Sequence, residues 1–198
     1  PLIGKTLDAP FTGRIYAVSI SNIRGALPHY GTMNADILME MWVNGSIIRD
    51  LALFTDPTQS EAIGSVRSVR PMFNEIAKHY EAVIFDAGGS EQALGHAKKL
   101  GVDRFNIDTQ KDSGYSFRNT DRAYLFKNES GWEHCLFARG DQLEALAQEK
   151  GFRTTQPEDK EYNLRFREDG TPENVESAEN DTVTFTNRHN RKHTSMVN

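Results

Sequence analysis

Two arginines, Arg67 and Arg70, stand three residues apart where a helix is expected to begin. A guanidinium offers a planar fork of donors to a carboxylate or phosphate, and a helix start adds free N–H groups and a favourable dipole. The spacing therefore predicts a site for an anionic ligand. The alternative is that these arginines pair with acids of the chain itself, such as Glu40 or Asp86, or lie in solvent.

A second candidate is the run from Asp86 to Ser90, which follows a short apolar strand. Ligands of open α/β sheets bind beyond the carboxyl ends of strands, and glycine allows a close backbone approach. We therefore expect Asp86, Gly88, Gly89 and Ser90 to contact a ligand. The run lacks the lysine of a phosphate-binding P-loop and the spacing of a dinucleotide fingerprint, so a plain turn is the alternative.

A third candidate is a charged pair within a predicted hairpin over residues 37–54. Asn44-Gly45 between two apolar runs is typical of a two-residue type I′ turn, which also fixes the register. That register predicts Glu40 beside Arg49. Such a pair could hold the strands in register, or it could orient a catalytic carboxylate or a ligand anion.

A fourth candidate is His134, in the run Trp132-Glu133-His134-Cys135. Adjacent residues of an extended segment point to opposite sides, so Cys135 is not expected to act with His134 as a nucleophile. We expect Cys135 to be an inert, half-buried thiol, and His134 is a candidate catalytic residue. No cofactor and no metal site is predicted.

The elements that would position these residues alternate between strands and helices. Ser21-Asn22 ends the first strand. Ser68 and Ser90 are possible helix caps, and Asp141 with Glu144 forms a capping box. The expected elements are a strand over 13–20, the hairpin, a strand over 82–86, and helices over 68–80, 90–100 and 141–150. The order predicts an α/β domain of three layers over residues 1–153, with a mixed sheet that includes the antiparallel hairpin at 37–54. Residues 154–198 are more polar and are interpreted as a linker with a partial β-rich segment.

Composition limits the functional classes. The 198 residues are 37% hydrophobic, carry a formal charge of −5 and include one cysteine. The negative charge argues against general affinity for nucleic acid or anionic membranes, and one cysteine excludes an internal disulfide. No apolar run approaches the ~18 residues of a membrane span.

These motifs, in this order, resemble the YerB-like lipoproteins, a family of bacterial domains of unknown function. The resemblance covers residues 1 to about 152 and departs from the family at Asp86, at Cys135 and at the hairpin turn. The matching site residues are Glu40, Arg49, Arg67, Ser68, Arg70, Gly88, Gly89, Ser90, Arg118 and His134. The resemblance implies a lipid anchor, absent from this chain, that holds the protein on the outer face of the cell membrane.

The residues leave three functions open. The first is the binding of an anionic or saccharide ligand of the cell wall in a polar cleft. The second is hydrolysis or lysis of a wall polymer with Glu40 as general acid/base and with His134 or Asp86 assisting. The third is a docking scaffold, which an exposed apolar patch would indicate.

Overall fold

The computed structural model describes residue 2 and residues 11–109, 114–119, 121, 130–158, 160, 181–186 and 192–197. The chain divides into two units, Pro1–Asn163 and Leu164–Asn198. The first unit extends beyond residue 153 because the chain returns to pair with its own start. Thr154 O accepts a hydrogen bond from Arg14 N at 2.9 Å, and Thr12 O accepts one from Gln156 N at 2.9 Å.

A five-stranded mixed sheet forms the centre of the first unit, which confirms the predicted α/β class. Its strands follow the order β2-β3-β1-β5-β6. β1 pairs antiparallel with β3 and parallel with β5, and β5 pairs parallel with β6. The strands are β1 (Tyr16–Ser21), β2 (Ile37–Asn44), β3 (Ile47–Phe54), β5 (Val83–Asp86) and β6 (Arg104–Asn106).

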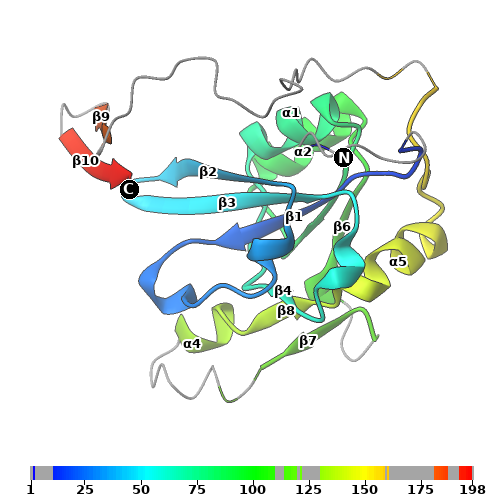
Figure 1. Cartoon of the computed structure of the whole chain (residues 1–198), viewed down its shortest axis with the longest axis horizontal. Coiled ribbons are helices and arrows are strands. Elements are labelled where there is room, and N and C mark those ends of the chain that lie inside the picture. The colour runs from blue at the N-terminus through cyan, green and yellow to red at the C-terminus, as the bar shows by residue number, and fades with distance from the viewer. Residues whose placement is uncertain are drawn as a thin grey trace, which may run out of the picture. The chain divides into compact units, whose positions relative to one another are not determined.

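Each face of this sheet is covered by a separate apolar core. On one face, Leu51 and Ile84 pack beneath helices α1 (Pro71–His79) and α2 (Glu91–Leu100). On the other face, Phe54 and Phe85 pack against helix α5 (Leu143–Glu149) and a small second sheet. That sheet has the order β4-β8-β7, with strands β4 (Ile63–Gly64), β7 (Ser116–Arg118) and β8 (Leu136–Ala138). Figure 1 shows α1 and α2 on one face and α5 with the small second sheet on the other.

The hairpin forms over the predicted residues, but the predicted register is wrong by one position. The chain turns at Gly45-Ser46 rather than at Asn44-Gly45, and the register shifts between Trp42 and Asn44. Glu40 therefore lies opposite Asp50, and Arg49 lies opposite Met41.

Apolar packing explains this register. It pairs Met39 with Leu51 and Ile37 with Leu53, so that these side chains share the core under α1 and α2. A shift of one residue would turn the apolar set of one strand to the opposite face, and burying several apolar side chains outweighs one partly exposed ion pair.

Helix boundaries agree with the sequence at α2 and differ at α1 and α5. Ser90 caps α2 by accepting a hydrogen bond from Ala93 N, and Gly101 ends it in the left-handed conformation. Ser68 does not cap α1, which begins later, at Pro71 after Arg70. A 3-10 turn over Gly140–Gln142 replaces the start predicted at Asp141.

The remaining elements are short. A four-residue helix, α4 (Ser130–Glu133), precedes β8, and further 3-10 turns span Arg24–Ala26, Thr32–Asn34, Pro57–Gln59 and Ile107–Thr109. In the second unit, β9 (Asp181–Thr186) and β10 (Lys192–Val197) form an antiparallel pair. Within the described ranges, no helix has the length and apolar character needed to cross a membrane.

Candidate functional site

An extended segment, residues 65–70, crosses the carboxyl ends of β1 and β5. Arg67 N donates to Ser19 O of β1 at 2.8 Å, and Arg67 O accepts a hydrogen bond from Ala87 N, just after β5, at 3.1 Å. Val69 N then donates to Gly88 O at 2.8 Å. The segment is thus held by backbone bonds on both sides, and it carries three predicted site residues, Arg67, Ser68 and Arg70, to the position where α/β sheets bind ligands.

Arg49, at the start of β3, is brought to the same segment from the sheet. It pairs with Ser21 of β1, and its Nη1 donates to Ser68 O. The residue is only 5% exposed, and its Nε has no hydrogen-bond partner. Among the ion pairs of the described chain, none includes Arg49 or Arg70. A buried charge without an acidic partner is costly, and this cost distinguishes Arg49 from a structural arginine.

Arg49, Arg67 and Arg70, which we term the arginine cluster, act on one another electrostatically. The pKa of Arg49 is lowered to about 10, mainly by burial and in addition by repulsion from Arg70 and Arg67. Burial and Arg67 also lower the pKa of Arg70. Guanidiniums are charged at neutral pH, so the cluster concentrates positive charge at one buried and two partly exposed side chains.

Among the described acids, Glu133 is the one that forms an ion pair with the cluster. Its Oε2 lies 2.9 Å from Arg67 Nη2, and its carbonyl oxygen accepts a hydrogen bond from Arg67 Nη1 at 3.2 Å. The Glu133 charge also acts on Arg49, whose pKa it raises. Arg67 Nε nevertheless has no partner. Thus one carboxylate accompanies three guanidiniums.

Arg118, on β7 of the small sheet, was also predicted to bind the ligand, but its guanidinium contacts other groups of the chain. It binds Asp108, donates to Trp132 O at 2.6 Å and lies over the Trp132 ring at 4.5 Å. Arg118 and Arg67 therefore hold consecutive carbonyl groups at the end of α4, which fixes the turn before His134. His134 itself is buried directly after Glu133.

Asp86 is separated from the arginine cluster by its own partners. It is fully buried, binds Arg104 through both carboxylate oxygens and accepts a hydrogen bond from Gly88 N at 2.8 Å. Burial raises its pKa to about 6, although the bonds from Arg104 favour the charged form. Asp86 thus shapes the Gly88 turn, which has a φ of 78°.

The helices α1 and α2 begin next to each other at this turn. Val69 and Gly89 form a parallel bridge, so the two chains enter their helices side by side. A Cβ at Gly89 would lie 2.8 Å from Val69 Cγ1, which explains the glycine there. The two N-terminal ends contribute positive partial charge to the side that carries the arginine cluster.

A further polar group, which the sequence did not reveal, surrounds Asp50 on the opposite face of the hairpin. Asn22 Nδ2 donates to Glu40 Oε2 at 2.8 Å and to Asp50 Oδ1 at 3.1 Å. Burial raises the pKa of Asp50 to about 6, and the nearby Glu40 charge raises it too, against the effect of His29 and Asn22. Only the correct register, with Glu40 opposite Asp50, would have indicated this group.

His29 joins Asp50 through a contact that requires a proton. Its Nε2 lies 2.8 Å from Ser21 O, and a carbonyl can only accept, so Nε2 carries a hydrogen. Its Nδ1 lies 3.7 Å from Asp50 Oδ2. This contact is favourable only when His29 is doubly protonated or Asp50 is neutral. Glu40, predicted to be catalytic, therefore adjoins the Asp50–His29 pair and not Arg49.

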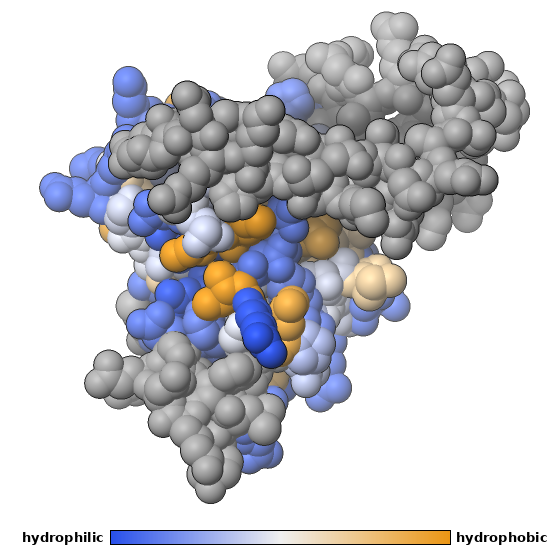
Figure 2. Space-filling model, turned by 90° about the vertical axis from the view of Figure 1, so that its left-hand side faces the viewer, coloured by the Kyte–Doolittle hydropathy of each residue, from blue (hydrophilic) through white to orange (hydrophobic). Residues whose placement is uncertain are grey.

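Exposed apolar side chains gather on the side that Figure 2 shows, among polar residues. Among the described residues, most of the large exposed apolar side chains belong to the β1–β2 connection or to the hairpin. They are Leu27, Tyr30, Met33, Leu38 and Ile47. If the protein were a docking scaffold, the third function considered from the sequence, a partner would bind to these residues.

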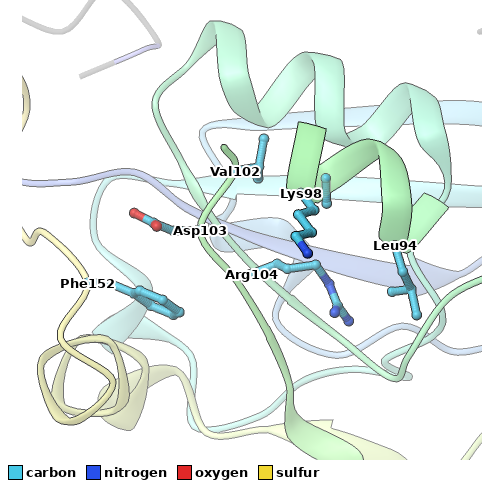
Figure 3. A pocket seen from close by; sticks show the side chains of 7 residues that line it. Leu94, Lys98, Val102, Asp103, Arg104 and Phe152 are labelled. Carbon is cyan, nitrogen blue, oxygen red and sulfur yellow. The ribbon is translucent and has the colours of Figure 1, made fainter. Parts of the chain in front are cut away.

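A hollow of about 250 Å³ lies along β6, away from the predicted residues (Figure 3). Lys98 of α2 and Arg104 extend into it, and Phe152 and Asp103 lie at its other end. Asp103 is bound by Arg14 at 2.7 Å, and Arg104 by Asp86. Across the described part of the chain, no group of three or more His, Cys, Asp or Glu side chains is arranged to hold a metal ion.

Comparisons with known proteins show the family to which this chain belongs. Residues 4–153 match the family described as "Protein of unknown function (DUF3048) N-terminal domain". "Putative lipoprotein YerB" of Bacillus subtilis is 26% identical over 189 residues, which cover 83% of this chain and 54% of that protein. The crystal structure of the B. subtilis YerB protein matches with a TM-score of 0.67 and 27% identity, over 79% of this chain and 51% of that one. This chain therefore spans about half the length of the relatives that it matches.

Proposed function

Because the chain belongs to the DUF3048 family, whose function is not known, we propose a function from its own residues: it binds an anionic ligand at the arginine cluster. One observation carries the proposal. Arg49 is buried and charged, has an unpartnered Nε, and has no carboxylate within ion-pair distance among the described residues. An anion that reached Arg49 would supply the missing partner and would gain charge-assisted hydrogen bonds.

The neighbouring groups support the same ligand chemistry. Arg67 and Arg70 are partly exposed, so a ligand can approach them from solvent. The starts of α1 and α2 add positive partial charge. The ligand that we infer is an anionic polymer of the bacterial cell wall, bound by a lipid-anchored protein on the outer face of the membrane. The name of the B. subtilis relative supports this location.

Sedimentation with purified bacterial cell wall tests the proposal. We expect the wild-type chain to pellet with intact wall and to remain in solution when anionic polymers have been removed from the wall. Arg49→Met, which removes the charge but keeps an apolar stem of similar size, should weaken binding about tenfold or more. The matched control is Lys99→Gln, which removes the same charge at the far end of α2.

Two results would contradict this function. Equal binding of intact and stripped wall would show that neutral saccharide, and not an anion, is recognised. Equal binding by Arg49→Met and the wild type would show that the cluster is not the site. Circular dichroism and urea unfolding of Arg49→Met establish that the variant is folded before its binding is compared.

A second candidate function, cleavage of a wall polymer, is favoured by the Asn22 bridge between Glu40 and Asp50. The Glu40 charge contributes to the raised pKa of Asp50, and two adjacent carboxyl groups can divide the roles of general acid and general base between them. Glu40 is the exposed member of the pair. Release of reducing ends from purified wall by the wild type, and its loss in Glu40→Gln, would support this function; no release by the wild type would eliminate it.

A further inference from the structure

Glu133 lies beside the arginine cluster, and its role there, which we infer below, rests on the proposed function. Its carboxylate binds Arg67 at 2.9 Å and acts on Arg49 through space. The side chain is 57% exposed, so the pair lies at the boundary with solvent. We propose that the Glu133 carboxylate occupies an anion position of the cluster, and that this occupancy makes the site selective for a phosphate dianion over a carboxylate.

The first argument concerns displacement. An ion pair with an exposed partner contributes only about 0–1 kcal/mol to stability, so a ligand can replace Glu133 at Arg67 by a rotation of one side chain. Arg67 would remain anchored through its bond to the Glu133 carbonyl oxygen. The backbone at the end of α4 therefore does not need to move when the carboxylate leaves.

The second argument concerns competition. A carboxylate tethered to the same chain acts at an effective concentration in the millimolar range, whereas a free ligand must supply its own concentration. A ligand carboxylate has the same charge and the same geometry as Glu133, so it gains nothing by replacing it. Glu133 thus excludes simple carboxylates from the position at Arg67.

The third argument concerns charge. The cluster has three guanidiniums and one acid, so two positive charges, those of Arg49 and Arg70, remain without an ion-pair partner in the described chain. A phosphate monoester or inorganic phosphate carries close to two negative charges above neutral pH and has three acceptor oxygens. It can therefore match two guanidiniums at once, and a monoanionic carboxylate cannot.

Calorimetric titration of the full chain with inorganic phosphate and with acetate, at about pH 8 and low ionic strength, tests this selectivity. The wild type should bind phosphate and show no acetate binding in the millimolar range. Glu133→Gln should bind phosphate about two- to fivefold more tightly and should gain measurable acetate binding. The control, Glu144→Gln on α5, removes the same charge near the opposite end of β1 and should match the wild type.

The outcomes separate this inference from the proposed function. If the wild type binds phosphate and Glu133→Gln has the same phosphate affinity and the same acetate affinity as the wild type, Glu133 does not compete with ligands. The inference is then wrong, and the proposal of anion binding is unaffected. Phosphate binding by neither protein overturns both. Glu133→Ala provides a second variant: it should behave as Glu133→Gln, because the effect depends on the charge alone.

Discussion

Glu40 of β2 and Asp50 of β3 face each other across the hairpin, and one amide group, that of Asn22, donates to both carboxylates. Asp50 is 1% exposed, whereas Glu40 reaches solvent. The two acids therefore have the same neighbour and very different surroundings, and burial keeps the pKa of Asp50 near 6.

Changing the two neighbours of Asp50 should move its pKa in opposite directions. Asn22→Ala removes a hydrogen bond to the charged carboxylate and should raise the pKa above 6. Glu40→Gln removes a negative charge and should lower it by a smaller amount. The Asp50 carboxyl carbon, followed by NMR over a pH titration, reports both shifts. A shift of the same sign in the two variants would contradict the assigned causes.

Asp50 should also make the stability depend on pH in the acidic range. Its pKa is about 6 in the folded chain against an ordinary value of 3.8, so between about pH 4 and pH 6 the folded state holds more protons than the unfolded state. The free energy of unfolding contributed by this group therefore falls as the pH rises through that window, by up to about 1.4 kcal/mol per pH unit.

Asp50→Asn removes this contribution. Urea unfolding at several pH values should show that the difference in stability, variant minus wild type, increases from pH 4 to pH 6 and is constant above the folded pKa. Asp86, whose pKa is also about 6, keeps its own dependence in both proteins and cancels in the difference. A difference that does not vary with pH would mean that Asp50 is charged throughout.

Arg104 should be essential for the stability of the fold at pH values where Asp86 is ionised. Arg104→Met leaves a buried carboxylate without its charged partner, and such a change destabilises by about 3–5 kcal/mol at pH 7.5. The loss should diminish toward pH 5, where the proton that Asp86 takes up removes the buried charge. Combining Arg104→Met with Asp86→Asn should recover most of the stability. Equal losses in the single and double variants would show that Arg104 acts through packing alone.

Two glycines near the start of α2 should respond oppositely to alanine. A Cβ at Gly89 would lie 2.8 Å from Val69 Cγ1 and 2.9 Å from Leu94 Cδ2, so Gly89→Ala should destabilise by about 1–3 kcal/mol. Gly95, inside the helix, has open space, and Gly95→Ala should stabilise by up to about 1 kcal/mol. Thermal unfolding of the two variants compares them directly, and stabilisation by Gly89→Ala would refute the close approach.

Several elements of this protein could be predicted from its sequence because they depend on the chemistry of a few neighbouring residues. Ser90 and Gly101 bound α2 because a hydroxyl can satisfy an open N–H group and glycine adopts a positive φ. The two apolar runs of the hairpin and the buried strand at residues 83–86 follow from residue types over a few positions. Arg67 and Arg70 were likewise found from their own spacing and from the helix that follows.

The tertiary structure decided which polar groups meet. Apolar packing of Met39 against Leu51 set the hairpin register, and that one-residue shift moved Glu40 from Arg49 to Asp50. Arg49 joined Arg67 because residues 65–70 cross the end of β1, and Asp86 was withdrawn from them by Arg104. These contacts join residues far apart in the chain. They depend on which face of each strand is buried, which is a property of the whole core and not of any short stretch of sequence.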